Sequence, residues 1–196
     1  MPNWASTNYR IEGEMKHLQT IYNVCKALEE GKHKPSANAA DNWEGDIILA
    51  LGLTEKELAE KKWYLRGFIE YFGIEDDTLE IQAEEAWGVT DFRFALKEIF
   101  GDEIEVFYIT EEPGCEVYQT NDVDGKYFTG LFEVDSYGLD ADCGIENFDE
   151  KEEALEYIAN LLKRESITEE ELDKWNEENE GEDRYILLHK YDKVAD

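Results

Sequence analysis

The stretch "EIEVFYITEEPGCEVYQTNDVDGKYFTGLFEVD", residues 103–135, decides the fold class of this 196-residue chain. It holds three runs that are rich in β-branched and aromatic residues, at 103–110, 115–120 and 126–135. Pro-Gly and Asp-Gly pairs separate these runs, and such pairs are typical of tight turns between strands. We therefore predict three successive strands of one sheet, joined by turns.

Strands and helices alternate in the part of the chain before this stretch. Side chains that alternate between polar and apolar predict strands at 7–13 and 78–87. Apolar residues that recur every three or four positions predict helices at 15–28, 54–73 and 90–101. A capping box of Thr54 and Glu57 predicts the start of the second helix. Together these patterns predict an α+β fold, in which a mainly antiparallel sheet is covered by helices on one face.

The last quarter of the chain is helical and acidic in pattern. An apolar stripe predicts one helix, and a capping box formed by Thr168 and Glu171 predicts the start of another. Residues 184–191 have the composition of a last strand. We expect residues 1–148 to form one α+β domain, and residues 149–196 to form an acidic helical extension with a last strand, packed on the same domain.

Charge is the most unusual property of the sequence. The chain has 49 acidic and 19 basic residues, a formal net charge of −30, and residues 70–150 alone hold 24 acids against three bases, a net of −21. Such a field repels the phosphates of nucleic acids, so direct nucleic-acid binding is disfavoured. It attracts basic proteins, and a basic protein is therefore the partner that we expect. General solubility is the alternative explanation for the charge.

Cysteine spacing and hydropathy bear on location and cofactors. Cys25, Cys115 and Cys143 are too widely spaced for a C-x-x-C site, which favours a reducing compartment, and we expect a cytoplasmic protein. The longest purely apolar run, residues 47–53, is too short to span a membrane. The sequence has neither a phosphate-binding loop nor a dinucleotide-binding motif, so we expect no cofactor and assign no catalytic or metal-binding residues.

Two features of residues 103–135 have the composition of reactive sites. Cys115 has Glu111, Glu112 and Glu116 as close neighbours, and these acids should raise its pKa and make it a poor nucleophile. The Asp-x-Asp-Gly turn approximates the first half of a calcium loop, but Leu131 stands where that loop needs a glutamate. Adventitious calcium binding stays open for a group of nearby acids, Asp122, Asp124, Asp135, Asp140 and Asp142.

The predicted partner-binding residues combine carboxylates with two tryptophans. The carboxylates are Glu103, Glu105, Glu111, Glu112, Glu116, Asp122 and Asp124. Trp43 lies in a polar loop and Trp175 on an acidic helix, so both are predicted to be exposed anchors for a partner. The remaining tryptophans, Trp4, Trp63 and Trp87, stand in patterns that are typical of a core.

Several segments resemble the YubB-like, ferredoxin-like family of phage and plasmid proteins. They are "MPNW" at the N-terminus, "WYLRGFIEYFG" where that family has a tryptophan-rich helix, "AEEAWGVTDFRFAL", and "YITEEPG" followed by a strand. The resemblance covers roughly residues 1–135. It implies a ferredoxin-like α+β fold and an origin in a mobile element, and it implies no catalytic residues.

We therefore expect a non-enzymatic accessory protein of a phage or mobile element. Its acidic face would bind a basic host partner, and in the sharpest version it would mimic DNA to inhibit a nucleic-acid-binding defence or regulatory protein. One alternative is a metal-assisted hydrolase built from clustered carboxylates. Another is an acidic protein with a purely structural role. The sequence leaves the oligomeric state open.

Overall fold

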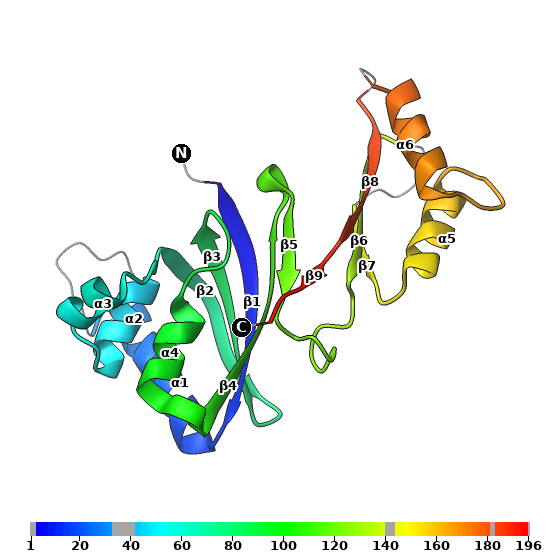
Figure 1. Ribbon diagram of the computed structural model, residues 1–196. Coiled ribbons are helices and arrows are strands. Elements are labelled where there is room, and N and C mark those ends of the chain that lie inside the picture. The colour runs from blue at the N-terminus through cyan, green and yellow to red at the C-terminus, as the bar shows by residue number, and fades with distance from the viewer. Residues whose placement is uncertain (1–2, 33–41, 140–143, 181–182, 196) are drawn as a thin grey trace. The chain divides into compact units, whose positions relative to one another are not determined.

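The computed structural model describes residues 3–32, 42–139, 144–180 and 183–195. The chain folds into two compact units (Figure 1). Unit 1 comprises Met1–Asp122 and Val194–Asp196, and unit 2 comprises Val123–Lys193. The predicted α+β class is confirmed, because both units have antiparallel sheets and the described residues form six α-helices. The division lies earlier in the chain than the boundary at residue 148 that the sequence suggested.

Unit 1 contains a sheet with the strand order β2-β3-β1-β4-β5, in which each strand runs antiparallel to its neighbours. The strands are β1 (Trp4–Gly13), β2 (Gly67–Glu75), β3 (Thr78–Ala86), β4 (Ile104–Glu112) and β5 (Val117–Thr120). The α-helices are α1 (Met15–Glu29), α2 (Glu44–Leu51), α3 (Glu55–Lys61) and α4 (Phe92–Phe100). Two short 3-10 helices, η1 (Gly101–Glu103) and η2 (Pro113–Cys115), flank β4.

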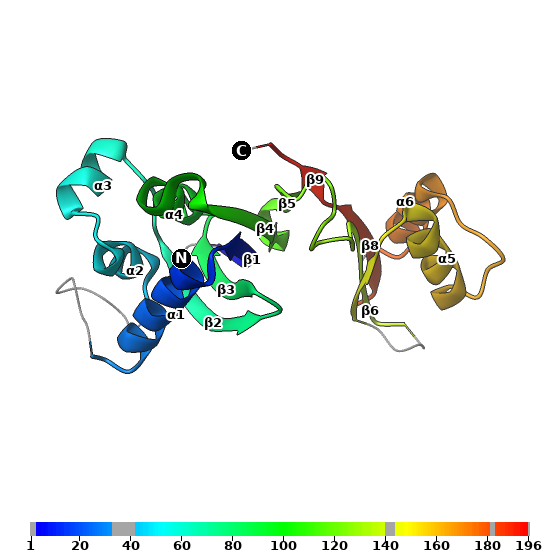
Figure 2. The ribbon, with the colours of Figure 1, turned by 90° about the horizontal axis from the view of Figure 1, so that it is seen from below.

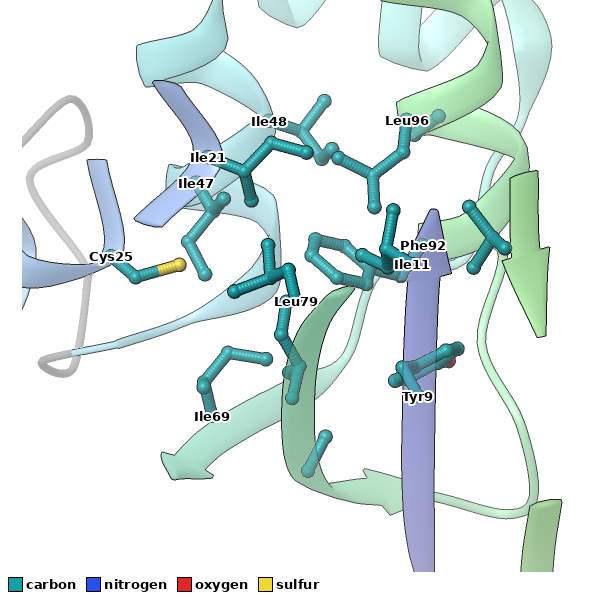
Figure 3. Packing of buried hydrophobic residues seen from close by; sticks show 14 of the residues in the cluster. Tyr9, Ile11, Ile21, Cys25, Ile47, Ile48, Ile69, Leu79, Phe92 and Leu96 are labelled. Atoms are coloured by element: carbon teal, nitrogen blue, oxygen red, sulfur yellow. The ribbon is translucent and has the colours of Figure 1, made fainter. Parts of the chain in front are cut away.

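The core of unit 1 lies between this sheet and the helices (Figure 2). Ile21 of α1, Ile48 of α2 and Phe92 of α4 converge on Ile11 of β1 and Leu79 of β3 (Figure 3). All five side chains are fully buried. Burial alternates along β1 with the two-residue period of a strand, so the intervening side chains of β1 lie on the opposite face of the sheet. We call this opposite face the open face.

The helix predicted at residues 54–73 is wrong beyond its first two turns. The predicted capping box of Thr54 and Glu57 is present, but α3 ends at Lys61 because Lys62 adopts a left-handed conformation, with φ of 57°. The chain then forms β2 and pairs with β3, with one β-bulge between Ile69 and Tyr71. Aromatic and β-branched side chains are favoured in strands, and here their pairing with β3 outweighs the helical spacing of the apolar residues.

The sequence predicted that the Asp-Gly turn joins two strands of one sheet, and this prediction is wrong. β5 pairs with β4 in unit 1, whereas the following strand, β6 (Phe132–Tyr137), belongs to the sheet of unit 2. Asn121 marks the change, because its side chain accepts from the amide of Tyr108 at 2.7 Å and donates to the carbonyl of Val106 at 2.9 Å. A side chain thus occupies the backbone partners on β4 that a further strand residue would need.

Unit 2 has a sheet of three strands with the order β7-β6-β8, and all pairs are antiparallel. Its elements are β6, β7 (Ile145–Phe148), α5 (Lys151–Leu161), α6 (Glu169–Glu178), β8 (Tyr185–Lys190) and β9 (Asp192–Lys193). Val134 and Ile186 of the sheet pack against Ile158 of α5 and Leu172 of α6. The predicted capping box at the start of α6 is present. The two acidic helices therefore share a core with β6, which the sequence had assigned to the first domain.

A pair of carboxyl groups is sealed inside unit 1, beneath Gly67. Glu44 of α2 and Glu85 of β3 are both fully buried, and Tyr9 donates to Glu85 Oε1 at 2.6 Å. The hydroxyl of Thr90 lies 2.7 Å from that oxygen and 2.8 Å from Glu44 Oε2, and it has only one hydrogen to donate. Within the described residues, Glu44 Oε1 and Glu85 Oε2 have no hydrogen-bond partner. We infer that one proton, held between the two carboxyl groups, supplies the missing donor.

The electrostatics of the pair agree with this proton. Burial, followed by the charge of Glu85, raises the pKa of Glu44 well above its usual range. The folded state therefore keeps a proton that the unfolded chain releases above about pH 4.3. The stabilisation from this proton is fully present at lower pH and is lost as the pH rises, by about 1.4 kcal/mol for each pH unit, until the folded pair itself titrates.

We expect Glu44→Gln to remove this dependence on pH. The amide keeps the shape of the side chain and a donor toward Glu85, but it has no proton to lose. Urea unfolding at pH 5, 6 and 7 should show the stability of the variant rising relative to wild type by about 1.4 kcal/mol for each pH unit. Glu60→Gln, an exposed change on α3, is the matched control and should show no such trend. A constant difference between Glu44→Gln and wild type would contradict the shared proton.

Candidate partner-binding surface

The open face of unit 1 is built from alternate residues of its central strands. Strand register places side chains of β1, β3 and β4 in rows across this face. They are Ser6, Asn8 and Arg10 of β1, Glu80, Gln82 and Glu84 of β3, and Glu105, Phe107, Ile109 and Glu111 of β4. Carboxylates thus recur on both strands that flank β1.

Two rows of this face differ in the residue that β1 contributes to them. In one row, Arg10 forms an ion pair with Glu80. In another row, Ser6 lies between Glu84 and Glu111 and contributes no charge. Partial burial, and then the charges of Glu70 and Glu111, raise the pKa of Glu84. The charges of Glu111 and of Glu70, which lies in the bulge of β2, therefore repel that of Glu84. We call these three residues the acidic row, and a cation placed beside Glu84 would relieve the repulsion.

The predicted carboxylates do not share one exposed surface. Glu103, Glu105, Glu116 and Asp124 are exposed and Glu111 is half-buried, with Asp124 in unit 2 and the others in unit 1. Glu112 and Asp122 are buried, so their assignment to partner binding is wrong. Glu112 follows Glu111 on β4, and neighbouring side chains of a strand point to opposite faces.

The predictions for the tryptophans are largely reversed. Trp43 is half-buried with its ring 4.8 Å from that of Phe68, and Trp175 is half-buried against the core of unit 2. Trp63 packs against the core of unit 1, as predicted. Trp4 is exposed, and Trp87 is 57% exposed because it directly follows β3 with a left-handed φ of 62° that turns it out of the strand alternation.

Cys115 sits in a setting that suppresses thiol reactivity. It is exposed, and the side-chain amide of Asn3 donates to its sulfur at 3.1 Å. The carboxylate of Glu112 is the main cause of a raised pKa of the Cys115 thiol. Cys25 is buried in unit 1, and burial raises its pKa to about 12. Both cysteines are therefore held as neutral thiols at pH 7.

The described part of the chain offers no group of three or more His, Cys, Asp or Glu side chains that could hold a metal ion. Of the acids considered for calcium, Asp140 and Asp142 lie outside the described residues, and Asp122 and Asp124 fall in different units. Within the same described ranges, no helix is both long and apolar enough to cross a bilayer. No protein-family model, curated protein or solved structure matches the chain.

We expect Cys115 to react slowly with iodoacetamide, and we expect the reaction to become faster when the carboxylate of Glu112 is removed. In a Cys143→Ser background, Glu112→Gln should increase the alkylation rate of Cys115 at pH 8 by severalfold, because it removes the group that raises the thiol pKa. Mass spectrometry of the alkylated peptide measures the rate. Glu105→Gln is the control of equal charge on the same strand. Equal rates for wild type and Glu112→Gln would show that Glu112 does not govern this thiol.

Proposed function

We propose that this chain is a non-enzymatic binding protein whose acidic surface engages a basic partner protein. The observation that carries the proposal is the acidic row, where partial burial, and then the charges of Glu70 and Glu111, raise the pKa of Glu84. A lysine or arginine of a partner would replace this repulsion by attraction. The net charge of −30 adds a long-range field that speeds the encounter with such a partner.

In the sharper form of the proposal, the protein mimics DNA. Its carboxylates take the place of phosphates and occupy the nucleic-acid groove of a host defence or regulatory protein, in the cytoplasm of the host cell. The rows of carboxylates on β3 and β4 support this form, because strand pairing fixes their spacing on a firm scaffold. The resemblance to phage and plasmid proteins supports the origin in a mobile element.

We also propose that unit 1 has a ferredoxin-like fold, as the resemblance implies. Two observations support this assignment. With the short helices α2 and α3 set aside as an insertion, the elements follow the order β1-α1-β2-β3-α4-β4. The corresponding strands are arranged as β2-β3-β1-β4. In such a fold the helices cover one face of the sheet and leave the other available to a partner.

The experiment compares two triple variants of the full chain with equal net charge. One removes the acidic row, by Glu70→Gln, Glu84→Gln and Glu111→Gln. The control removes three exposed acids from helices of unit 1, by Glu29→Gln, Glu55→Gln and Glu60→Gln. We expect wild type and the control to capture a basic host protein at about 50 mM salt and to release it at about 500 mM salt. The added salt shortens the distance over which charges attract one another.

The acidic-row variant should lose at least about tenfold in affinity, which corresponds to about 1.4 kcal/mol. Double-stranded DNA should displace the wild-type protein from its partner if the protein mimics DNA. An equal loss in both triple variants would show that total charge alone matters. Capture that ignores salt, or no capture of a basic protein, would refute the proposed function.

A further inference from the structure

The sheet of unit 2 has a second face that its helices do not cover. α5 and α6 pack on one side of β6 and β8 (Figure 1). On the other side, Ile145 is 57% exposed, Tyr137 51%, Leu187 40% and Tyr185 37%. Isolated apolar side chains on a surface are ordinary, but contiguous ones mark an interaction site.

Strand register shows that these side chains are contiguous. Tyr137 of β6 lies opposite Tyr185 of β8, and their rings stack with centroids 5.9 Å apart and planes 24° from parallel. In the neighbouring row, Asp135 lies between Ile145 of β7 and Leu187 of β8. We call these five residues the tyrosine face.

Asp135 gives this face its chemical character. It is the one carboxylate among the five residues, and it is flanked by two aliphatic side chains in its own row. Partial burial, and then the charge of Asp135, raise the pKa of Tyr185, so this carboxylate lies close to the tyrosine pair. A carboxylate between two exposed aliphatic side chains needs a cationic partner when a protein covers it, because an unpaired buried charge is costly.

We propose that the tyrosine face receives an arginine side chain of a basic partner protein, whose guanidinium stacks on the tyrosine pair and donates to Asp135. The inference rests on the proposed function and adds the kind of side chain that unit 2 recognises. The planar guanidinium suits both contacts, since it stacks on aromatic rings and pairs with a carboxylate through two parallel hydrogen bonds. Ile145 and Leu187 contact apolar groups beside the arginine and exclude water from the charge pair.

Charge also favours a basic partner on the tyrosine face over the main alternative, which is a second copy of the chain. In a symmetric dimer built on this face, the Asp135 carboxylates of both copies would enter the same apolar interface. Each copy would also bring a formal charge of −30. A basic partner neutralises Asp135, whereas a second copy adds like charge to it.

The test titrates the full chain with the peptide acetyl-Gly-Leu-Arg-Leu-Gly-amide and follows the backbone amide signals by NMR. Two analogues replace the arginine by lysine or by citrulline, which keeps the shape of the side chain but is neutral. We expect the arginine peptide to shift the signals of Asp135, Tyr137 and Tyr185. The lysine peptide should bind at least about threefold more weakly. The citrulline peptide should produce no saturable shift.

Three variants locate the interaction. Asp135→Asn should weaken binding of the arginine peptide about tenfold, whereas Glu156→Gln, an exposed change of equal charge on α5, should leave it unchanged. Tyr185→Phe keeps the ring and loses only the hydroxyl, so it should weaken binding less than Tyr185→Ala does. The amide spectrum of each variant reports whether unit 2 is still folded, and Tyr185→Phe preserves the comparison if Tyr185→Ala unfolds it.

Several outcomes would overturn the inference. They are equal binding by wild type and Asp135→Asn, equal binding of arginine and citrulline peptides, or shifts that map to other residues. Sedimentation that shows a dimer abolished by Leu187→Ser would assign the face to a second copy. If the acidic-row experiment succeeds while the arginine peptide fails to bind, this inference alone falls. If both fail, the proposed function falls with it.

Discussion

The two-sided pairing of β1 is the constraint on which unit 1 depends. β1 is hydrogen-bonded to β3 on one side and to β4 on the other, so its side chains are fixed to one face or the other along its length. Tyr9 and Ile11 enter the core, while Ser6 and Arg10 enter the open face. A slip of one residue would expose Ile11 and bury Arg10. The core and the acidic row are therefore two consequences of one register.

The sequence could predict those elements in which a local pattern decides the structure. The helix at 15–28 and both capping boxes are confirmed, because spacing and caps act within a few residues. The helix at 54–73 is wrong because Leu65, Phe68 and Phe72 fit a helical face and also suit a strand. Only pairing with β3, which is distant in sequence, decides between these possibilities. Turn signals near Asn121 likewise do not say which sheet the next strand will join.

The candidate surfaces were less predictable than the fold, because the sequence counts charges but does not place them. Glu111 and Glu112 are neighbours of one type, yet Glu112 is buried and Glu111 reaches the open face. Trp87 has an apolar neighbourhood in sequence and is exposed in the structure. Strand register places Asp135 between Ile145 and Leu187, which lie on two other strands, so its surroundings cannot be read from its neighbours in sequence. Such cross-strand neighbours leave no local signal.

The two surfaces differ in the range over which they act, and this difference favours distinct roles. The acidic row works through a field that reaches roughly 10 Å at moderate salt and that added salt screens. In the proposed function, it would set how fast a basic partner arrives. The proposed arginine site on the tyrosine face would work through contact. Water exclusion and stacking there are little affected by salt, and they would set how long the partner stays. Charge alone attracts any basic protein, whereas a carboxylate framed by stacked tyrosines accepts a particular side chain in a particular orientation. Selectivity for one partner would then reside in unit 2, even though the sequence drew attention to the charge of residues 70–150.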